Sequence, residues 1–316
     1  MSKFVNKLTY AIIFFIFVIL AFSCSYTNNQ IPNADIINSG TITNININEA
    51  SGIAVSRIQK NIIWVINDSG NSTLVFAINS KGNHLGTINI QGVKNNDWED
   101  MASFKYNGNS YILIADVGDN KAKRNKYFLH IIQEPDSEQI SYHSTLSIKP
   151  SWSIEFTYED GPRDCESVAV DVLNEKVLLL SKRDRPPVLY SLPLNSQKNV
   201  VARKIGAIKP LSQAKQNNTR KLKYYKNTAQ PTAMDISADG LSVIVLTYVN
   251  AYYFNLEKTS DWSSVFLNPP QEIILPFMRQ AESVCFDNSG TSIYITSEKI
   301  PAPLIKVDLR KFMKKI

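Results

Sequence analysis

Short hydrophobic runs, separated by small polar residues, make up most of the chain from about residue 34 onward. The runs are rich in Val, Ile, Tyr, Phe and Trp, and clusters of Asn, Asp, Gly and Ser lie between them. Such runs are typical of β-strands joined by tight turns, and almost no helical periodicity accompanies them. The pattern therefore predicts an all-β protein.

These runs recur as a repeating unit of strands. Each unit begins with a strand that starts on an oxygen-bearing side chain. We call these residues the anchors: Ser51, Glu99, Glu166, Thr232 and Glu282. A second and a third strand follow each anchor strand, and a less regular fourth follows in the first four units. Four antiparallel strands repeated around an axis form a propeller blade, so we expect a β-propeller of five four-stranded blades. Six blades is the competing count.

The last unit runs out of chain after its third strand. The segment 34–47 precedes the first anchor, resembles a strand and belongs to no unit. We expect this N-terminal strand to complete the last blade and close the ring, which would remove an exposed sheet edge.

The N-terminus carries the features of an export signal. Lys3 and Lys7 precede an unbroken apolar run over 11–22, and Ser23-Cys24 follows. Residues 20–24 resemble the lipobox of bacterial lipoproteins, although Ala21 stands where Leu is usual. We expect a signal peptide over 1–23, a linker over 24–33 that begins with lipidated Cys24, and one propeller domain over 34–316. This predicts a membrane-anchored lipoprotein facing the periplasm or cell surface. The alternative is a soluble secreted protein.

Charge and cysteine content narrow the choice of partners. The formal net charge is +6, and loss of Lys3 and Lys7 would lower it to +4, which does not suggest a nucleic-acid partner. The segment 198–227 holds nine Lys or Arg residues and no acid. It is either a solvated loop or a contact for anionic lipid, polysaccharide or a partner. Cys165 and Cys285 belong to the third and fifth units, so no disulfide is expected, and the protein is expected to be a monomer.

One face of the predicted propeller collects acidic residues. Loops that enter the first strand and leave the second emerge on the same face. This face therefore gathers Glu99, Glu166, Glu282, Asp68, Asp116, Asp119 and Glu298. Around these acids stand Trp98, Arg163, Lys182, Tyr248 and Arg279. Clustered carboxylates must hold protons, pair with cations or bind a metal, and hard oxygen ligands favour Ca²⁺ or Mg²⁺.

We expect the three Glu anchors to be metal ligands, helped by Asp68 or Asp116, with Asp119 and Glu298 as candidate catalytic bases. The surrounding residues, together with Asp68 and Asp116, are the expected ligand-binding set. The alternative is structural: glutamates at strand starts can cap neighbouring N–H groups, and the basic residues can neutralise the ring.

Several kinds of site are excluded by their missing motifs. The three histidines (His84, His130 and His143) share no spacing with one another or with the acids. No G-x-S-x-G, phosphate-loop, C-x-x-C or H-E-x-x-H motif occurs. We therefore expect neither a zinc site nor a histidine-dependent triad.

Three stretches resemble an uncharacterised family of secreted bacterial propeller proteins. They are Trp64–Gly70 with Asn-Asp-Ser-Gly, Asp97–Ala102 with Asp-Trp-Glu-Asp, and Ala115–Asn120 with Asp-Val-Gly-Asp-Asn, followed by Gln133-Glu-Pro135. More distantly, the layout is similar to calcium-dependent propeller hydrolases of the gluconolactonase, paraoxonase and phytase-like groups. That likeness implies Ca²⁺ at the mouth of the channel. These hydrolases place Asn among their ligands where this chain has Ser51 and Thr232, which departs from their pattern.

Two functions remain open. The first is a binding module that presents its acidic face to a small molecule, saccharide or protein. The second is a metal-dependent hydrolase of an ester, lactone or phosphoester. A glycosidase with paired carboxylates is a third option, which depends on a separation that sequence does not give.

Overall fold

The computed structural model describes residues 34–195, 198–211, 228–256 and 261–313, all within the unit Asn33–Ile316. The predicted signal peptide 1–23, Cys24 and the linker 24–33 lie outside the described residues, as does the part 212–227 of the basic segment. Helix is confined, in the described ranges, to a 3-10 helix η1 (Ser137–Gln139) and α3 (Trp262–Val265). Neither of these two helices is long and apolar enough to span a membrane.

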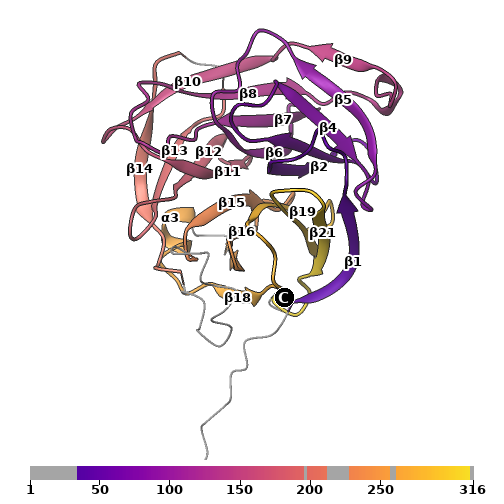
Figure 1. The fold of residues 1–316 in the computed structure, drawn as a ribbon. Helices are drawn as coiled ribbons and strands as arrows, with labels where there is room; N and C mark the ends of the chain where they lie inside the picture. Colours follow the sequence, from indigo (N-terminus) through magenta and orange to yellow (C-terminus); the bar gives the residue numbers. More distant parts are fainter. Residues whose placement is uncertain (1–33, 196–197, 212–227, 257–260, 314–316) are drawn as a thin grey trace, which may run out of the picture. The chain divides into compact units, whose positions relative to one another are not determined.

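The strands of the described ranges form four sheets, and Figure 1 shows how they are arranged. From one edge to the other, the first sheet contains β2 (Ala50–Val55), β3 (Ile63–Asn67), β4 (Leu74–Ile78), β5 (His84–Ile90) and β9 (Thr145–Ile148). The largest contains β11 (Cys165–Asp171), β12 (Lys176–Ser181), β13 (Val188–Pro193), β14 (Val200–Ala207), β10 (Trp152–Tyr158), β8 (Tyr127–Gln133), β7 (Asn109–Asp116) and β6 (Trp98–Tyr106). A third contains β15 (Pro231–Ile236), β16 (Ser242–Thr247), β17 (Asn250–Asn255) and β18 (Gln271–Ile274). The last contains β1 (Asp35–Ile42), β21 (Ala302–Asp308), β20 (Ser292–Ser297) and β19 (Ala281–Phe286).

Parallel pairing at outer strands enlarges two of these sheets. In the eight-stranded sheet, Phe156–Tyr158 of β10 pair in parallel with Val200–Ala202 of β14, and this joint connects two antiparallel four-stranded sets. In the first sheet, β9 adds to β5 in the same parallel manner. Both contacts cover the unpaired N–H and C=O groups that an outer strand would otherwise expose.

The anchor strands lie innermost. Strands β2, β6, β11, β15 and β19 each contact the next in that order, and β19 contacts β2. Four of them are buried at every residue, and β6 at all but its last two. Because the five innermost strands contact one another in a cycle, the fold is all-β and propeller-like.

The segment expected to supply an outer strand does form one. Strand β1 pairs antiparallel with β21, from Asp35 opposite Asp308 to Ile42 opposite Ala302. Figure 1 shows this indigo strand beside the yellow end of the chain. The fourth sheet is therefore built from both ends of the described chain.

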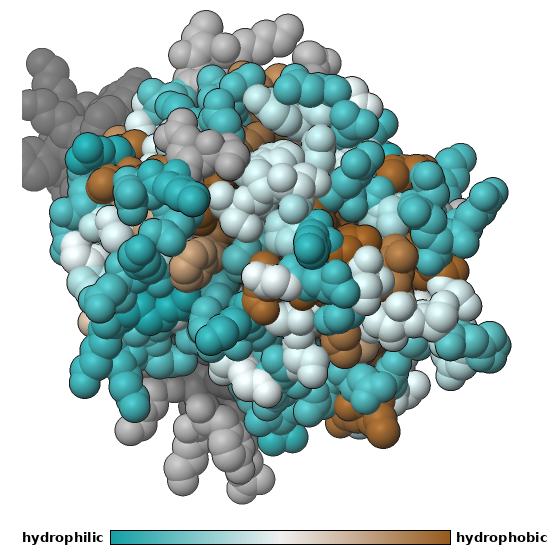
Figure 2. Space-filling model, turned by 90° about the horizontal axis from the view of Figure 1, so that it is seen from above, coloured by the Kyte–Doolittle hydropathy of each residue, from teal (hydrophilic) through white to brown (hydrophobic). Residues whose placement is uncertain are grey.

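Apolar side chains fill the space between the sheets. One buried cluster joins β6–β8 and β10 to β11–β14, with Phe156, Tyr158 and Tyr190 among its members. The free thiol of Cys165 lies in the same cluster, while the free thiol of Cys285 is buried in a different one. The face seen in Figure 2 is mostly hydrophilic, with hydrophobic residues scattered in small groups.

Two buried carboxylates tie the inner strands together. Asp100 of β6 accepts hydrogen bonds from Met101 N, from Val168 N of β11 and from Met234 N of β15, at 2.9, 2.8 and 3.1 Å. Asp235 of β15 accepts from Ile236 N and from Phe286 N of β19, at 2.9 and 2.8 Å. Burial raises the pKa of Asp100 well above its ordinary value and that of Asp235 to about 6. These side chains link four of the five inner strands.

Candidate functional site

Each anchor is the extra residue of a β-bulge. The register between the first and second strands of every unit shifts across one residue, and in each case that residue is the anchor: Ser51, Glu99, Glu166, Thr232 and Glu282. A bulge leaves its extra residue outside the ladder and changes the direction of its side chain. The repeat found in the sequence therefore corresponds to a repeated backbone distortion at one end of the inner strands.

Two anchors hold neighbouring strands together. The hydroxyl of Ser51 donates to Trp98 O at 2.8 Å, and that of Thr232 donates to Ala281 O at 2.9 Å. Each bond joins one inner strand to the next. These two positions are therefore structural, and they add no charge to the face.

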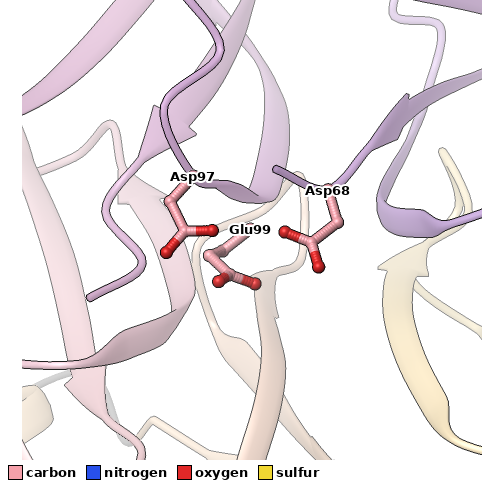
Figure 3. Close-up of side chains that lie close together, drawn as sticks. All are labelled: Asp68, Asp97 and Glu99. Atoms are coloured by element: carbon pink, nitrogen blue, oxygen red, sulfur yellow. The ribbon is translucent and has the colours of Figure 1, made fainter. Parts of the chain in front are cut away.

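The anchor Glu99 lies in a group of three carboxylates with Asp68 and Asp97. One oxygen from each residue lies within 4.8 Å of the others. Asp68 follows β3, Asp97 precedes β6, and Glu99 lies in β6 itself (Figure 3). Glu99 is 7% exposed, while Asp68 and Asp97 are half-buried. No described residue donates a hydrogen bond to the carboxylate of Glu99 or forms an ion pair with it. A buried carboxylate without a donor is unusual, because burial without a partner is costly.

A glycine makes room for this group. A Cβ atom on Gly118 would lie 2.2 Å from Glu99 Oε1 and 2.6 Å from Asp97 Oδ2. The backbone at this position does not have a positive φ, so the glycine is required by space. The N–H groups of Val117 and Gly118 both donate to Asp97 O at 3.1 Å, which holds the loop against the acids.

The three carboxyl groups have raised pKa values. Burial, followed by the charges of Glu166, Asp68 and Asp97, raises the pKa of Glu99 well above its ordinary value. Burial and the charge of Asp68 raise the pKa of Asp97 to about 6, and burial also raises the pKa of Asp68. The site therefore favours either a bound proton or a bound cation.

Glu99 also borders a second group, formed with Asp164 and Glu166. Here the chain supplies its own cations. Lys182 forms an ion pair with Glu166, and Arg183 Nε lies 2.5 Å from Asp164 Oδ2. Lys182 also lies over the Tyr248 ring, 5.2 Å from its centre. Burial raises the pKa of Glu166 to about 7 although Lys182 opposes the shift, while Glu166 raises the pKa of Lys182 against its burial.

The third glutamate anchor has different neighbours. Gln280 Nε2 donates to Glu298 Oε2 at 2.7 Å and more weakly to Glu282 Oε1 at 3.4 Å. Burial and the nearby Glu298 raise the pKa of Glu282 well above its ordinary value. The charges of Glu166 and Lys182 act on Glu282 as they do on Glu99, but Glu282 belongs to neither close carboxylate group.

Three more of the expected site residues have structural partners. Asp116 accepts from Asp97 N at 3.1 Å and from Asn96 Nδ2 at 2.6 Å, and pairs with Arg124 at 2.8 Å. Asp119 Oδ2 accepts from the N–H groups of residues 123 and 124, both at 2.7 Å, and from the Tyr127 hydroxyl at 2.8 Å. Trp98 is fully buried, and its indole donates to Lys94 O at 3.1 Å.

The two expected arginines lie apart from the carboxylate groups. Arg163 pairs with Asp160 and Asp184, at 2.8 and 2.9 Å, and stacks over Tyr190. Arg279 is exposed, and its side chain makes no ion pair with a described residue. Neither guanidinium neutralises the acids around Glu99.

Asp97 and Asp164 are not among the site residues predicted from the sequence, although the repeat contains a signal for them. Each lies two residues before an anchor, and the same position in the other units is Glu49, Gln230 or Gln280. In four units, the backbone carbonyl of the residue two positions before the anchor accepts a hydrogen bond from the start of the loop after the second strand. The donors are the backbone N–H groups of Asp68, Val117 with Gly118, Lys182 and Glu298. A polar residue two positions before each anchor is thus a second feature of the repeat.

A cavity of about 570 Å³ adjoins the first carboxylate group and includes Asp97 in its lining. The rest of the lining is Asn96, Asp119, Asn120, Lys121, Lys123, Arg124, Asn125, Lys126 and Phe128. The acidic group therefore has beside it a polar cavity whose lining carries four basic residues and two acids, Asp97 and Asp119.

Comparison with known proteins gives little further guidance. No protein-family model matches the chain, and no curated protein matches it. Among solved structures, the chain is similar to a gluconolactonase from Xanthomonas campestris, with 10% sequence identity and a TM-score of 0.41. The alignment covers 82% of this chain and 72% of that one. The function of the chain must therefore be inferred from its own residues.

Proposed function

We propose that this protein is a five-bladed propeller, closed by β1, that binds Ca²⁺ between Asp68, Asp97 and Glu99. In this proposal it is a binding module that presents its acidic face to a ligand outside the cytoplasm. The cyclic contacts of the five anchor strands and the pairing of β1 with β21 support the five-blade count.

The observation that carries the cation site is the unpartnered carboxylate of Glu99. Two ligands on opposite sides of a Ca²⁺ ion at about 2.4 Å lie about 4.8 Å apart. The three carboxylate oxygens lie within that distance of one another. The neighbouring group around Glu166 is a poorer candidate, because Lys182 and Arg183 already neutralise its acids.

Calcium titration of the full-length chain tests this proposal. Calorimetry should show one calcium site in wild type and none in Glu99→Gln. The matched control is Glu155→Gln, which should bind calcium like wild type, because Glu155 is a surface acid paired with Lys126. At a calcium concentration of 100 times Kd, wild type should gain about 2.7 kcal/mol in its free energy of unfolding. Equal calcium affinity in wild type and Glu99→Gln would refute the site.

The proposed cellular location rests on the N-terminal sequence alone. We place the protein in the cell envelope as a monomeric lipoprotein anchored through Cys24, facing the periplasm or cell surface. Its ligand would be a small molecule, saccharide or protein, with no role for nucleic acid. A Cys24→Ala variant should leave the membrane fraction. Wild type recovered entirely in the soluble fraction would favour ordinary secretion.

The second candidate is a metal-dependent hydrolase of an ester, lactone or phosphoester. It is favoured by the pKa values of Asp97 and Glu166, about 6 and about 7, because a general acid or base works best near the ambient pH. The other candidate base, Asp119, is poorer, since three hydrogen bonds hold its carboxylate and its pKa is lowered. Turnover of an ester, lactone or phosphoester that is lost in chelator and in Glu166→Gln would support the enzyme. Calcium binding without turnover would support the binding module.

A further inference from the structure

A separate cavity of about 280 Å³ lies at the other end of the inner strands. Every inner strand contributes to it at or just beyond its C-terminal end, through Arg57, Ser103, Phe104, Val170, Ile236 and Asn288. The anchors lie at the opposite, N-terminal ends of the same strands. The cavity is therefore centred on the ring of inner strands, on the face away from the carboxylate groups.

The lining of this cavity combines apolar residues, two basic residues and the neutral polar residues Ser103, Ser237 and Asn288. Phe104, Val170, Val172, Leu173 and Ile236 supply the apolar wall, and Arg57 and Lys105 are its charged residues. No Asp or Glu belongs to the lining. Ligand cavities usually measure about 300–1,000 Å³, so this one suits a small ligand.

Arg57 is held in place but is not neutralised. Its Nε donates to Ser103 O at 3.0 Å, and one terminal nitrogen donates to Asn288 Oδ1 at 3.1 Å. The guanidinium is in a half-buried residue, and it makes no ion pair with any carboxylate in the described ranges. Its second terminal nitrogen makes no hydrogen bond to a described residue. A fixed guanidinium with free donors matches the two oxygens of a carboxylate.

Burial raises the pKa values of Glu134 and Asp235, and the nearby charge of Arg57 opposes this rise. Other donors nevertheless hold the oxygens of both acids. Glu134 accepts from the backbone N of Arg57, at 3.0 and 3.2 Å, and from Trp64 Nε1. Asp235 accepts from the two backbone N–H groups of Ile236 and Phe286. Neither acid occupies the second terminal nitrogen of Arg57, so the donors of that nitrogen remain available to a ligand.

We propose that this cavity binds a small monocarboxylate with a short apolar chain. Its carboxylate accepts hydrogen bonds from Arg57, with Lys105 adding positive charge, and its chain lies against Val170, Val172 and Ile236. The site is distinct from the calcium site and does not depend on it. Asp100 and Asp235, which link the inner strands, lie in strands between the two ends.

The test uses the full-length chain in chelator, titrated by calorimetry with straight-chain monocarboxylates from butanoate to octanoate and with the matching alcohols. Wild type should bind the acids, and Arg57→Gln should bind them about tenfold more weakly or worse, as expected for loss of a charge-assisted hydrogen bond. The alcohols should bind both proteins alike. Lys60→Gln, which changes an exposed cation outside the lining, is the charge control and should bind like wild type.

A second variant guards against misfolding of Arg57→Gln. Ala238 is exposed at the cavity edge, so Ala238→Trp should obstruct the cavity without disturbing the core. It should abolish acid binding while calcium binding and the circular-dichroism spectrum stay unchanged. The proposal is overturned if wild type binds none of the acids, or if Arg57→Gln and Ala238→Trp both bind them as wild type does. Neither result would bear on the calcium site.

Discussion

Gly118 and Glu99 are packed so closely that a methyl group on residue 118 would lie 2.2 Å from Glu99 Oε1. Gly118→Ala should therefore displace Glu99, Asp97 or the loop itself, and weaken calcium binding by about tenfold or more, since each lost hard ligand costs affinity. Calorimetric titration of the folded variant measures the change.

Gly206→Ala is the matched control for Gly118→Ala. Gly206 also lacks a positive φ, and the nearest atom to a Cβ there would be Ser263 Cβ at an ordinary 3.5 Å. This variant should bind calcium like wild type. If both glycine variants retain full affinity, the loop at Gly118 does not position the ligands.

Trp64 and Glu134 join two motifs that are far apart in the sequence. The indole Nε1 of Trp64 donates to Glu134 Oε1 at 2.9 Å in a buried setting. Trp64→Phe should lower the free energy of unfolding by about 2 kcal/mol, because a buried hydrogen bond to a charged acceptor is lost. Urea denaturation gives the value.

Trp152→Phe offers a comparison for the Trp64 variant. Trp152 is half-buried, and its indole donates to the neutral carbonyl of Leu194 at 3.0 Å. Trp152→Phe should therefore lower the free energy of unfolding by less than Trp64→Phe does. Equal costs would mean that the charge of Glu134 adds nothing to the Trp64 contact.

Lys182 and Glu166 form a buried ion pair, with 8% of each side chain exposed. Lys182→Met should lower the free energy of unfolding by about 3–5 kcal/mol, because it leaves a buried carboxylate without its cation. The double variant Glu166→Gln with Lys182→Met should recover part of this loss. Urea denaturation of the four proteins in this double-mutant cycle measures the coupling.

The pair of Lys126 and Glu155 is the surface counterpart, with 54% and 27% of the side chains exposed. Lys126→Met should lower the free energy of unfolding by less than about 1 kcal/mol, because exposed ion pairs contribute little to stability. A loss for Lys182→Met as small as this would show that Glu166 takes up a proton or moves toward solvent at little cost.

Asp235 predicts a specific dependence of stability on pH. Its pKa in the folded protein, about 6, is raised above the ordinary value of 3.8, so the folded state holds this proton more tightly than the unfolded state does. The contribution to stability is therefore complete below about pH 4 and is lost as the pH rises through 6. The shift corresponds to about 3 kcal/mol at most.

Asp235→Asn removes this titration. In chelator, the free energy of unfolding of wild type should fall more steeply between pH 4 and pH 7 than that of Asp235→Asn. The difference between the two urea-denaturation profiles isolates the contribution of this carboxyl group. Parallel profiles for the two proteins would contradict the raised pKa.

The strand repeat could be predicted because it is local. Each unit places an oxygen-bearing anchor directly before an apolar run, and the structure turns each of these positions into a bulge. The parallel strand β9 could not be predicted in the same way. Its partner β5 lies more than fifty residues earlier in the sequence, from Ile90 to Thr145, and nothing in either run specifies the pairing.

The chemistry of the site was less accessible from sequence than the fold. Asp116 and Asp119 appear in an acid-rich stretch, but Arg124 and Tyr127, a few residues later, satisfy their oxygens. Glu282 has the same strand position as Glu99, but Gln280 and Glu298 are its neighbours. Which acids remain free depends on partners from other loops, and the repeat alone does not encode these.

The pairing of β1 with β21 has a mechanical consequence. Because Asp35 lies opposite Asp308, the N-terminal end of β1 and the C-terminal end of β21 lie side by side at the same end of the strand pair. A force applied between the two termini would load these backbone hydrogen bonds one after another, as in a zipper, instead of shearing them all together. The fourth sheet should therefore open first, at low force, and release β1 before any inner strand is disturbed.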